Sequence, residues 1–327
     1  MPVDPRVLVV VPAFNAETTI LETLQTILAS TVPLRCVVVD PSSTDATPSL
    51  VAELARSDAR LTYARVDPGG PGITRRRGAE GASEELLIFV DADDVWSPGC
   101  LEALVAALDA NATAPLAVAR FSTVDWAGCP VEVSSYPTWV DAPQRPVRLH
   151  LEASSVLDFA TASSRLCFPP PAGVLVRRSA YEAVGGFDPG VARSEDVFTW
   201  IKMTQLGSGV LATDAHFSYR VHDAQRSQSS GRGRGAIRAR VLGLSVACDR
   251  SLLLVSLHGA IATYATFARE RISAGLRRRD AHALGAGLRN FAICGYLAGW
   301  ALVWLVIPNA VRVRRFAGGI DRGLRRS

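Results

Sequence analysis

One apolar run that ends in three acids constrains this chain more than any other feature. Leu86 to Val90 is apolar at every position, and the sequence Asp-Ala-Asp-Asp follows directly at 91–94. A run of this kind without Gly or Pro is typical of a central strand that helices cover on both faces. Ligands of such sheets bind beyond the carboxyl ends of the strands. We therefore expect these acids to lie at a binding site.

The spacing of the acids suggests what they bind. Side chains two residues apart on an extended chain point the same way, so Asp91 and Asp93 can converge on one ligand. Their hard oxygen ligands suit Mg²⁺ or Mn²⁺ with a bound phosphate. A solvated acidic turn is the alternative, because Asp is common in turns. The motif alone does not separate these two interpretations.

Two further strand patterns precede the apolar run. Val7 to Val11 is apolar throughout, and helical spacing follows over Glu17 to Ala29. Cys36 to Val39 ends at Asp40, and the polar side chains at 42–47 offer caps for a helix that begins there. The loop after the first strand lacks the G-x-G-x-x-G pattern, so a dinucleotide-binding dehydrogenase is not indicated.

The next segment completes an alternating pattern of strands and helices. Leu61 to Arg65 predicts a short third strand, and Arg75 lies on the helix that follows a turn rich in Gly and Pro. The strand and helix order predicts an α/β fold with a parallel, doubly wound sheet.

Residues 170–200 carry a second group of motifs. A strand that runs into a helix is predicted at Gly173 to Arg178, and the Gly-Gly-Phe-Asp sequence at 185–188 predicts a turn. Glu195 and Asp196 follow, with Trp200 four residues beyond Asp196. Acids at a helix N-terminus can simply favour the helix dipole. An acid at a binding site can instead accept the proton of a hydroxyl nucleophile.

These motifs together resemble a known family. Residues 9–15, Asp40 with residues 43–45, Arg75, and residues 91–94 match in order and spacing the nucleotide-binding half of the family 2 inverting glycosyltransferases. That resemblance implies a GT-A fold with a mostly parallel, doubly wound sheet, a nucleotide-sugar donor and a Mg²⁺ or Mn²⁺ cofactor. The sequence departs from the family at Pro41, where a second Asp is common, and at Arg76, where Asn is common.

The resemblance also implies residue roles. Asp196 would be the general base, since it occupies the second position of the family's Glu-Asp motif. Candidate metal ligands are Asp91, Asp93 and His222. The substrate-binding candidates, which would contact the base, the ribose, the phosphates or the acceptor, are Pro12, Phe14, Asp40, Arg75, Asp91, Glu195 and Trp200.

The last third of the chain differs in character. Residues 231–327 hold 17 Arg against 4 acids, although the formal charge of the whole chain is only +4. Two runs without Asp, Glu, Lys or Arg, 251–268 and 291–307, lie between Arg clusters. We expect a basic, apolar, helical tail that contacts a membrane surface and not nucleic acid. Whether it spans the membrane or lies on it stays open, because Arg flanks both runs.

The predicted organisation has two parts. Residues 1–230 form the glycosyltransferase domain, with a nucleotide-sugar-binding half at 1–110 and an acceptor half at 111–230, and residues 231–327 form the tail. The expected reaction moves a sugar, with inversion, from a nucleotide diphosphate sugar such as a UDP-sugar to a hydroxyl of a glycan or lipid-linked acceptor. Such an enzyme would work in cell-envelope polysaccharide or glycolipid synthesis, at the cytoplasmic face of the cell membrane.

Two rival functions are considered. A sugar-1-phosphate nucleotidyltransferase would need a glycine-rich N-terminal loop, which this sequence lacks. A catalytically inactive nucleotide-binding scaffold at the membrane is the alternative of another class. The presence of Asp91, Asp93 and Asp196 together argues against a scaffold that has lost turnover.

Overall fold

The computed structural model describes residues 4–131, 148–149, 170–191, 195–203, 206–207 and 209–221, with isolated helical residues between 272 and 295. The chain divides into two compact units, one of residues 1–151 with 168–228 and one of residues 152–167 with 229–327. The fold below is that of the first unit.

The first half of this unit is a parallel sheet with connecting helices. Its strands are β1 (Val7–Pro12), β2 (Leu34–Asp40), β3 (Leu61–Arg65) and β4 (Leu86–Phe89). The helices between them are α1 (Ile20–Leu28), α2 (Thr47–Ser57) and α3 (Pro71–Ala79). Strand β1 pairs in parallel with both β2 and β4, and β2 pairs in parallel with β3. The predicted strands are confirmed here. Strands β1, β2 and β4 are largely apolar and buried, whereas β3, at the edge of the sheet, is partly exposed.

The second half adds strands that reverse direction. Its strands are β5 (Val95–Trp96), β6 (Leu116–Val124), β7 (Arg148–Leu149), β8 (Val174–Arg177) and β9 (Gly209–Arg220). Its helical elements are α4 (Cys100–Asp109), the 3-10 turn η2 (Pro171–Gly173), α6 (Arg178–Ala183) and α7 (Glu195–Met203).

The complete sheet is mixed, not mostly parallel as the sequence suggested. Its order is β3-β2-β1-β4-β8-β6-β9-β5, with β7 on β9. Strand β8 is antiparallel to its neighbours β4 and β6, and β5 and β7 are antiparallel to β9. Only β6 and β9 continue the parallel arrangement in this half. The α/β class is confirmed, and the parallel part is confined largely to the first four strands.

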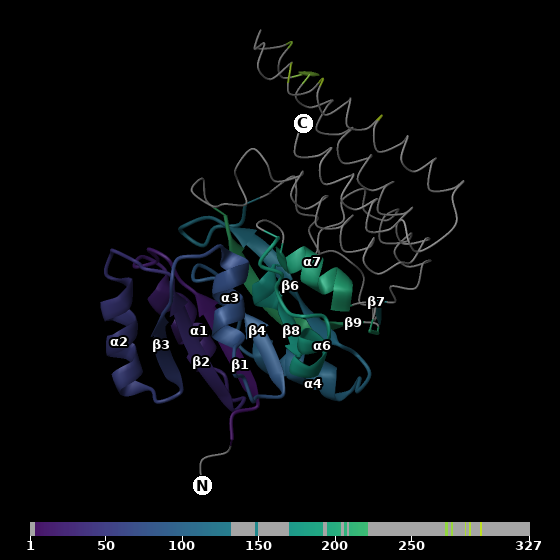
Figure 1. The fold of residues 1–327 in the computed structure, drawn as a ribbon, viewed down its shortest axis with the longest axis horizontal. Helices are drawn as coiled ribbons and strands as arrows, with labels where there is room; N and C mark the ends of the chain where they lie inside the picture. The colour runs from purple at the N-terminus through teal and green to yellow at the C-terminus, as the bar shows by residue number, and fades with distance from the viewer. Residues whose placement is uncertain are drawn as a thin grey trace, which may run out of the picture. The chain divides into compact units, whose positions relative to one another are not determined.

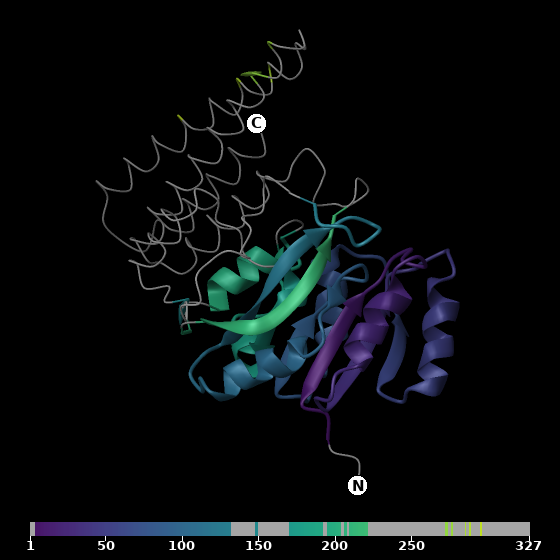
Figure 2. The same cartoon turned by 180° about the vertical axis from the view of Figure 1, so that it is seen from behind.

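Helices cover both faces of the sheet. Alternate residues of β1 divide between two cores, with Val7 and Val9 packing on one face and Leu8 and Val10 on the other. Figures 1 and 2 show α1, α2 and α4 on the first face and α3, α6 and α7 on the second. The carboxyl ends of β1, β2 and β4 therefore open between these layers, where ligands of such sheets bind.

The predicted basic tail lies outside the described residues, apart from the isolated positions named above. Within the part of the chain that the structure describes, no helix combines the length and apolar character needed to cross a bilayer. Membrane contact by residues 231–327 therefore stays a prediction.

Candidate active site

Asp40 ends β2 and is completely buried. Its carboxylate accepts hydrogen bonds from the backbone N–H of Ser43 at 2.6 Å and from the Tyr63 hydroxyl at 2.8 Å. Burial and the hydrogen bond to Asp40 raise the pKa of Tyr63 to about 12, so the phenol stays a donor. In this structure Asp40 shapes the loop after β2, and its predicted contact with a nucleobase stays a prediction.

The loops after β1 and β2 are joined by side chains that the sequence analysis assigned to helix capping. No side chain caps α2 at Ala46. Instead, Ser43 Oγ accepts from the N–H of Asn15 at 2.9 Å, and Thr47 Oγ1 accepts from the N–H of Ala16 at 2.8 Å. Asn15 Oδ1 in turn accepts from the backbone of residue 44 at 2.9 Å. Of the predicted caps, Asp45 does serve the helix, because its Oδ1 accepts from the N–H of Thr47 at 3.0 Å, whereas the hydroxyls of Ser43 and Thr47 bond to the neighbouring loop.

This joined pair of loops presents an aromatic ring. Phe14 is 61% exposed, while Pro12, the last residue of β1, is half-buried. Asn15 has a φ of 50°, in the left-handed region that Asn tolerates better than most residues. The exposed ring therefore stands on a backbone that the Ser43 and Thr47 hydroxyls hold in place.

The acidic loop at 91–94 follows β4 directly. Asp91 and Asp93 are half-buried, and Asp94 is completely buried. Asp94 Oδ1 accepts from the backbone N–H of Arg220, at the end of β9, at 3.4 Å. Burial first, and then the charges of Asp93 and Asp91, raise the pKa of Asp94 well above its ordinary value. The sheet therefore gathers three carboxyl groups at one strand end.

The residues of this loop suit a hard divalent cation. Oδ2 of Asp94 is buried and has no hydrogen-bond partner, which leaves a lone-pair donor beside two other carboxylates. Carboxylate oxygens are the ligands that Mg²⁺ and Mn²⁺ prefer. Among the described residues no three His, Cys, Asp or Glu side chains form a ready cluster, and His222 lies outside them. Asp91 and Asp93 would hold the ion, with Asp94 behind them.

Arg75 connects the acidic loop to the second motif region. Its guanidinium donates through Nη2 to Asp91 Oδ1 and through Nη1 to Glu195 Oε1, the latter at 2.6 Å. The side chains of Arg75 and Glu195 are each only 6% exposed. Burial lowers the pKa of Arg75, but the charges of Asp91, Glu195 and Asp196 outweigh it and raise that pKa overall. Motifs 120 residues apart are thus in direct contact.

Helix α7 carries the predicted base on its first turn. Asp196 is half-buried, and its charge acts on Arg75, which places it near the Arg75 guanidinium. Trp200 differs from expectation, because it is only 1% exposed and packs edge-on against Phe187, with ring centroids 5.8 Å apart. Phe187 in turn contacts Phe89 of β4 at 4.8 Å. Trp200 therefore anchors α7 to the sheet in this structure and offers no surface to a substrate.

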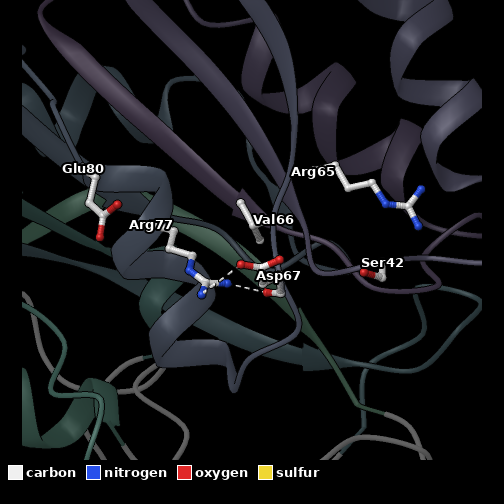
Figure 3. A pocket seen from close by; sticks show the side chains of 6 residues that line it. All are labelled: Ser42, Arg65, Val66, Asp67, Arg77 and Glu80. Carbon is white, nitrogen blue, oxygen red and sulfur yellow. Dashed lines mark hydrogen bonds and ion pairs between the residues drawn. The ribbon is translucent and has the colours of Figure 1, made fainter.

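An open pocket of about 560 Å³ lies beside this site, and Figure 3 shows the side chains around it. Arg77 reaches it from α3, and Glu80 reaches it from the position that follows this helix. Arg77 faces Asp67, with 4.0 Å between Nη2 and Oδ2. The lining residues are Ser42, Arg65, Val66, Asp67, Arg77 and Glu80. None of the predicted site residues is among them, so this pocket flanks the site and does not contain it.

Two residues that the structure brings to the site were not among the predicted site residues. Asp94 was part of the predicted acidic run but received no role of its own, and the structure buries it completely. Arg220 ends β9, is 4% exposed and donates through Nη2 to Glu22 at 2.8 Å. Its only signal in the sequence was a single Arg two residues before His222, which does not separate a site residue from a surface one.

Comparison with known proteins identifies the class. Residues 8–133 match the family described as "Glycosyl transferase family 2". Over these residues the chain is similar to the family 2 glycosyltransferases.

Individual relatives are more distant. The chain is 32% identical over 152 residues to the succinoglycan biosynthesis protein ExoO of Rhizobium meliloti, and the match covers 46% of this chain and 43% of that protein. It spans less than half the length of the first curated relatives that it matches.

Two solved structures show the same fold. S. aureus TarS 1-349 in complex with UDP-GlcNAc aligns with a TM-score of 0.55 at 18% identity, over 90% of this chain and 92% of that one. The mannosyltransferase PcManGT from Pyrobaculum calidifontis, in complex with GDP-Man and Mn²⁺, aligns with a TM-score of 0.52 at 22% identity, over 93% and 88%. At these identities the likeness establishes the GT-A-type fold alone.

Proposed function

We propose that this protein is an inverting glycosyltransferase that moves a sugar from a nucleoside diphosphate sugar to a hydroxyl group of a glycan or lipid-linked acceptor. The observation that carries the proposal is the contact made by Arg75, which joins Asp91 of the acidic loop to the residue before Asp196. A donor-side acid and an acceptor-side acid then flank one site, as a single displacement requires.

Each side of the site has a distinct task in this reaction. Asp196 accepts the proton of the acceptor hydroxyl as that oxygen attacks the anomeric carbon, because a neutral hydroxyl is a poor nucleophile. Phe14 offers an exposed ring for the base of the donor. A divalent cation held by Asp91 and Asp93 would neutralise charge on the departing diphosphate. One displacement inverts the anomeric centre without a covalent intermediate.

The donor class and pathway are supported by the relatives. TarS is described with UDP-GlcNAc and PcManGT with GDP-Man, so nucleoside diphosphate sugars are the donors to test, UDP-sugars first. ExoO is described as a succinoglycan biosynthesis protein, which favours cell-envelope polysaccharide or glycolipid synthesis. The Arg-rich tail favours work at the cytoplasmic face of the membrane, where lipid-linked acceptors are available.

The test is turnover of donor by the full-length protein with Mn²⁺. UDP release from a panel of UDP-sugars should depend on the metal and rise when membrane lipid extracts are added as acceptors. Asp196→Asn keeps the shape of the base but accepts no proton, so turnover should fall roughly 10²- to 10⁴-fold while UDP still binds. The control is Asp214→Asn, an exposed position on β9. Donor binding without any turnover by the wild type would favour the inactive scaffold instead.

A further inference from the structure

The contact between Arg75 and Glu195 is unusual because both charges are buried. The two residues are 5% and 4% exposed, and their side chains meet at 2.6 Å. Removing a charged pair from water costs several kcal/mol per ion, which the pair recovers only with good geometry and further hydrogen bonds. The second arm of the guanidinium supplies one, to Asp91. An ion pair on the surface would not have this cost of desolvation, so the burial of Arg75 and Glu195 needs a structural or functional explanation.

The backbone around Glu195 is shaped to admit its side chain. A Cβ at Gly72, on the first turn of α3, would lie 2.7 Å from Cγ of Glu195. Any larger residue at position 72 would therefore push Glu195 away from Arg75. On the other side, the Thr199 hydroxyl donates to the carbonyl oxygen of Glu195 at 2.8 Å and fixes the first turn of α7. Two separate elements thus accommodate this one carboxylate.

The aromatic ring beneath Arg75 ties the same contact to the core. The guanidinium carbon lies 5.9 Å from the centroid of the Phe187 ring, and Phe187 packs between Phe89 and Trp200. Arg75 is therefore held by α3, by the acidic loop, by α7 and by the turn at 185–188. With both terminal nitrogens engaged and a side chain only 6% exposed, it has little surface left for a base or phosphate.

We propose that Arg75 and Glu195 are positioning residues, which form a buried bridge that fixes the donor carboxylate Asp91 relative to the helix that carries Asp196. This inference rests on the proposed function, since the bridge would set the distance between the donor site at Asp91 and the general base Asp196. It replaces the substrate-binding roles that the family resemblance gave to both residues. The bridge acts through Asp91 and Asp196 and touches no substrate itself.

A positioning role predicts that turnover falls while donor binding persists. Misplacing a reacting group by about 1 Å can lower a rate on the order of 100-fold. Glu195→Gln keeps the shape and removes the charge, and Arg75→Lys keeps the charge but reaches only one partner. We expect kcat to fall about 10- to 100-fold in each, with the Kd for UDP and Mn²⁺ within about 3-fold of wild type. Direct substrate contacts would instead weaken UDP binding, and that result would overturn the proposal.

The double variant provides a second test. Because each single change breaks the same bridge, the double variant Arg75→Lys/Glu195→Gln should lose little more kcat than either single variant. Losses that multiply would mean that the residues act separately and would refute the bridge. Two controls exclude simple loss of fold: Glu84→Gln breaks the ion pair of another buried carboxylate, and Glu182→Gln breaks an exposed pair on α6. Both should keep the wild-type kcat.

Amide hydrogen exchange separates this inference from the proposed function. In Glu195→Gln, amides in the first turns of α7 should exchange faster than in wild type, while those of α4 stay unchanged. Unaltered exchange in α7 would refute the bridge even if the enzyme is active. A wild-type protein that turns over no donor would refute the proposed function, and the exchange result would still decide on the bridge.

Discussion

At the residue scale, arginine side chains form ion pairs with buried carboxylates, and the pair of Arg35 with Glu84 is the simplest case. It lies just before β4, is 3% exposed and accepts from Arg35 of β2 through both oxygens, at 2.6 and 3.2 Å. Burial alone would raise the pKa of Glu84, but the hydrogen bonds and charge of Arg35 outweigh it and hold that pKa below its usual 4.5. The pair joins two strands that are not neighbours in the sequence.

Glu84→Gln should therefore destabilise the domain in a pH-dependent way. A folded-state pKa below the unfolded value means that charged Glu84 stabilises the fold above about pH 4.5, and that this stability is lost as the pH falls through the lower folded-state pKa. We expect a cost of about 1.5–3 kcal/mol at pH 7. Chemical unfolding of wild type and variant at pH 7 and near pH 3 measures it, and a gap that does not narrow at low pH would contradict the prediction.

The acidic loop gives a second prediction at this scale. Asp93 is half-buried, so Asp93→Ala should fold normally, yet it removes one of the two carboxylates that would hold the cation. Binding of UDP should then lose its dependence on Mn²⁺. Calorimetric titration of UDP with and without Mn²⁺ tests this, with Asp214→Ala as the control for loss of one exposed acid. Metal-dependent binding that survives the change would place the cation elsewhere.

At the scale of elements, the position of helix α3 depends on a single glycine. A Cβ at Gly78 would lie 2.4 Å from Val10 and 2.7 Å from Val39, so α3 can approach β1 and β2 only because position 78 has no side chain. The same helix carries Arg75. The backbone of α3 and the contacts of Arg75 are thus set by one close approach to the sheet.

Gly78→Ala should displace α3 and lower both stability and activity. Overpacking of a well-packed core costs roughly 1–3 kcal/mol. Gly70→Ala is the matched control, since a Cβ there meets nothing within 4 Å. Thermal unfolding and kcat should both fall for position 78 and stay near wild type for position 70. Equal stability of the two variants would show that α3 can shift without loss.

Among the elements, those with local sequence signals could be predicted, and those that depend on long-range pairing could not. Strands β1, β2 and β4 and the turn at 185–188 were predicted because their signals are local: unbroken apolar runs, and two glycines with φ of 82° and 64°. The insertion of β8 beside β4 was not predicted, because this pairing joins residues 87 to 91 positions apart and leaves no periodic pattern in the sequence. Glu195 and Trp200 matched family motifs, but burial decides their roles and no motif encodes burial.

At the scale of the whole molecule, we predict that the tail of residues 231–327 holds the enzyme at a membrane. Each Arg near an anionic lipid surface contributes about 1 kcal/mol, and burial of an apolar helix face adds a term that salt does not screen. High salt alone should therefore not release the full-length protein from membranes. Truncation after about residue 235 should leave a soluble domain that still binds UDP. Fractionation tests both, and full-length protein that is soluble at low salt would refute membrane association.

The joined loops after β1 and β2 have a kinetic consequence for the donor. Fixing the backbone of one flexible residue costs about 1–2 kcal/mol in conformational entropy. The hydroxyls of Ser43 and Thr47 already hold the backbone around Phe14, so that loss occurs during folding and not when a nucleotide arrives. The surface proposed for the base of the donor is thus preorganised, and nucleotide association should not wait for this loop to become ordered.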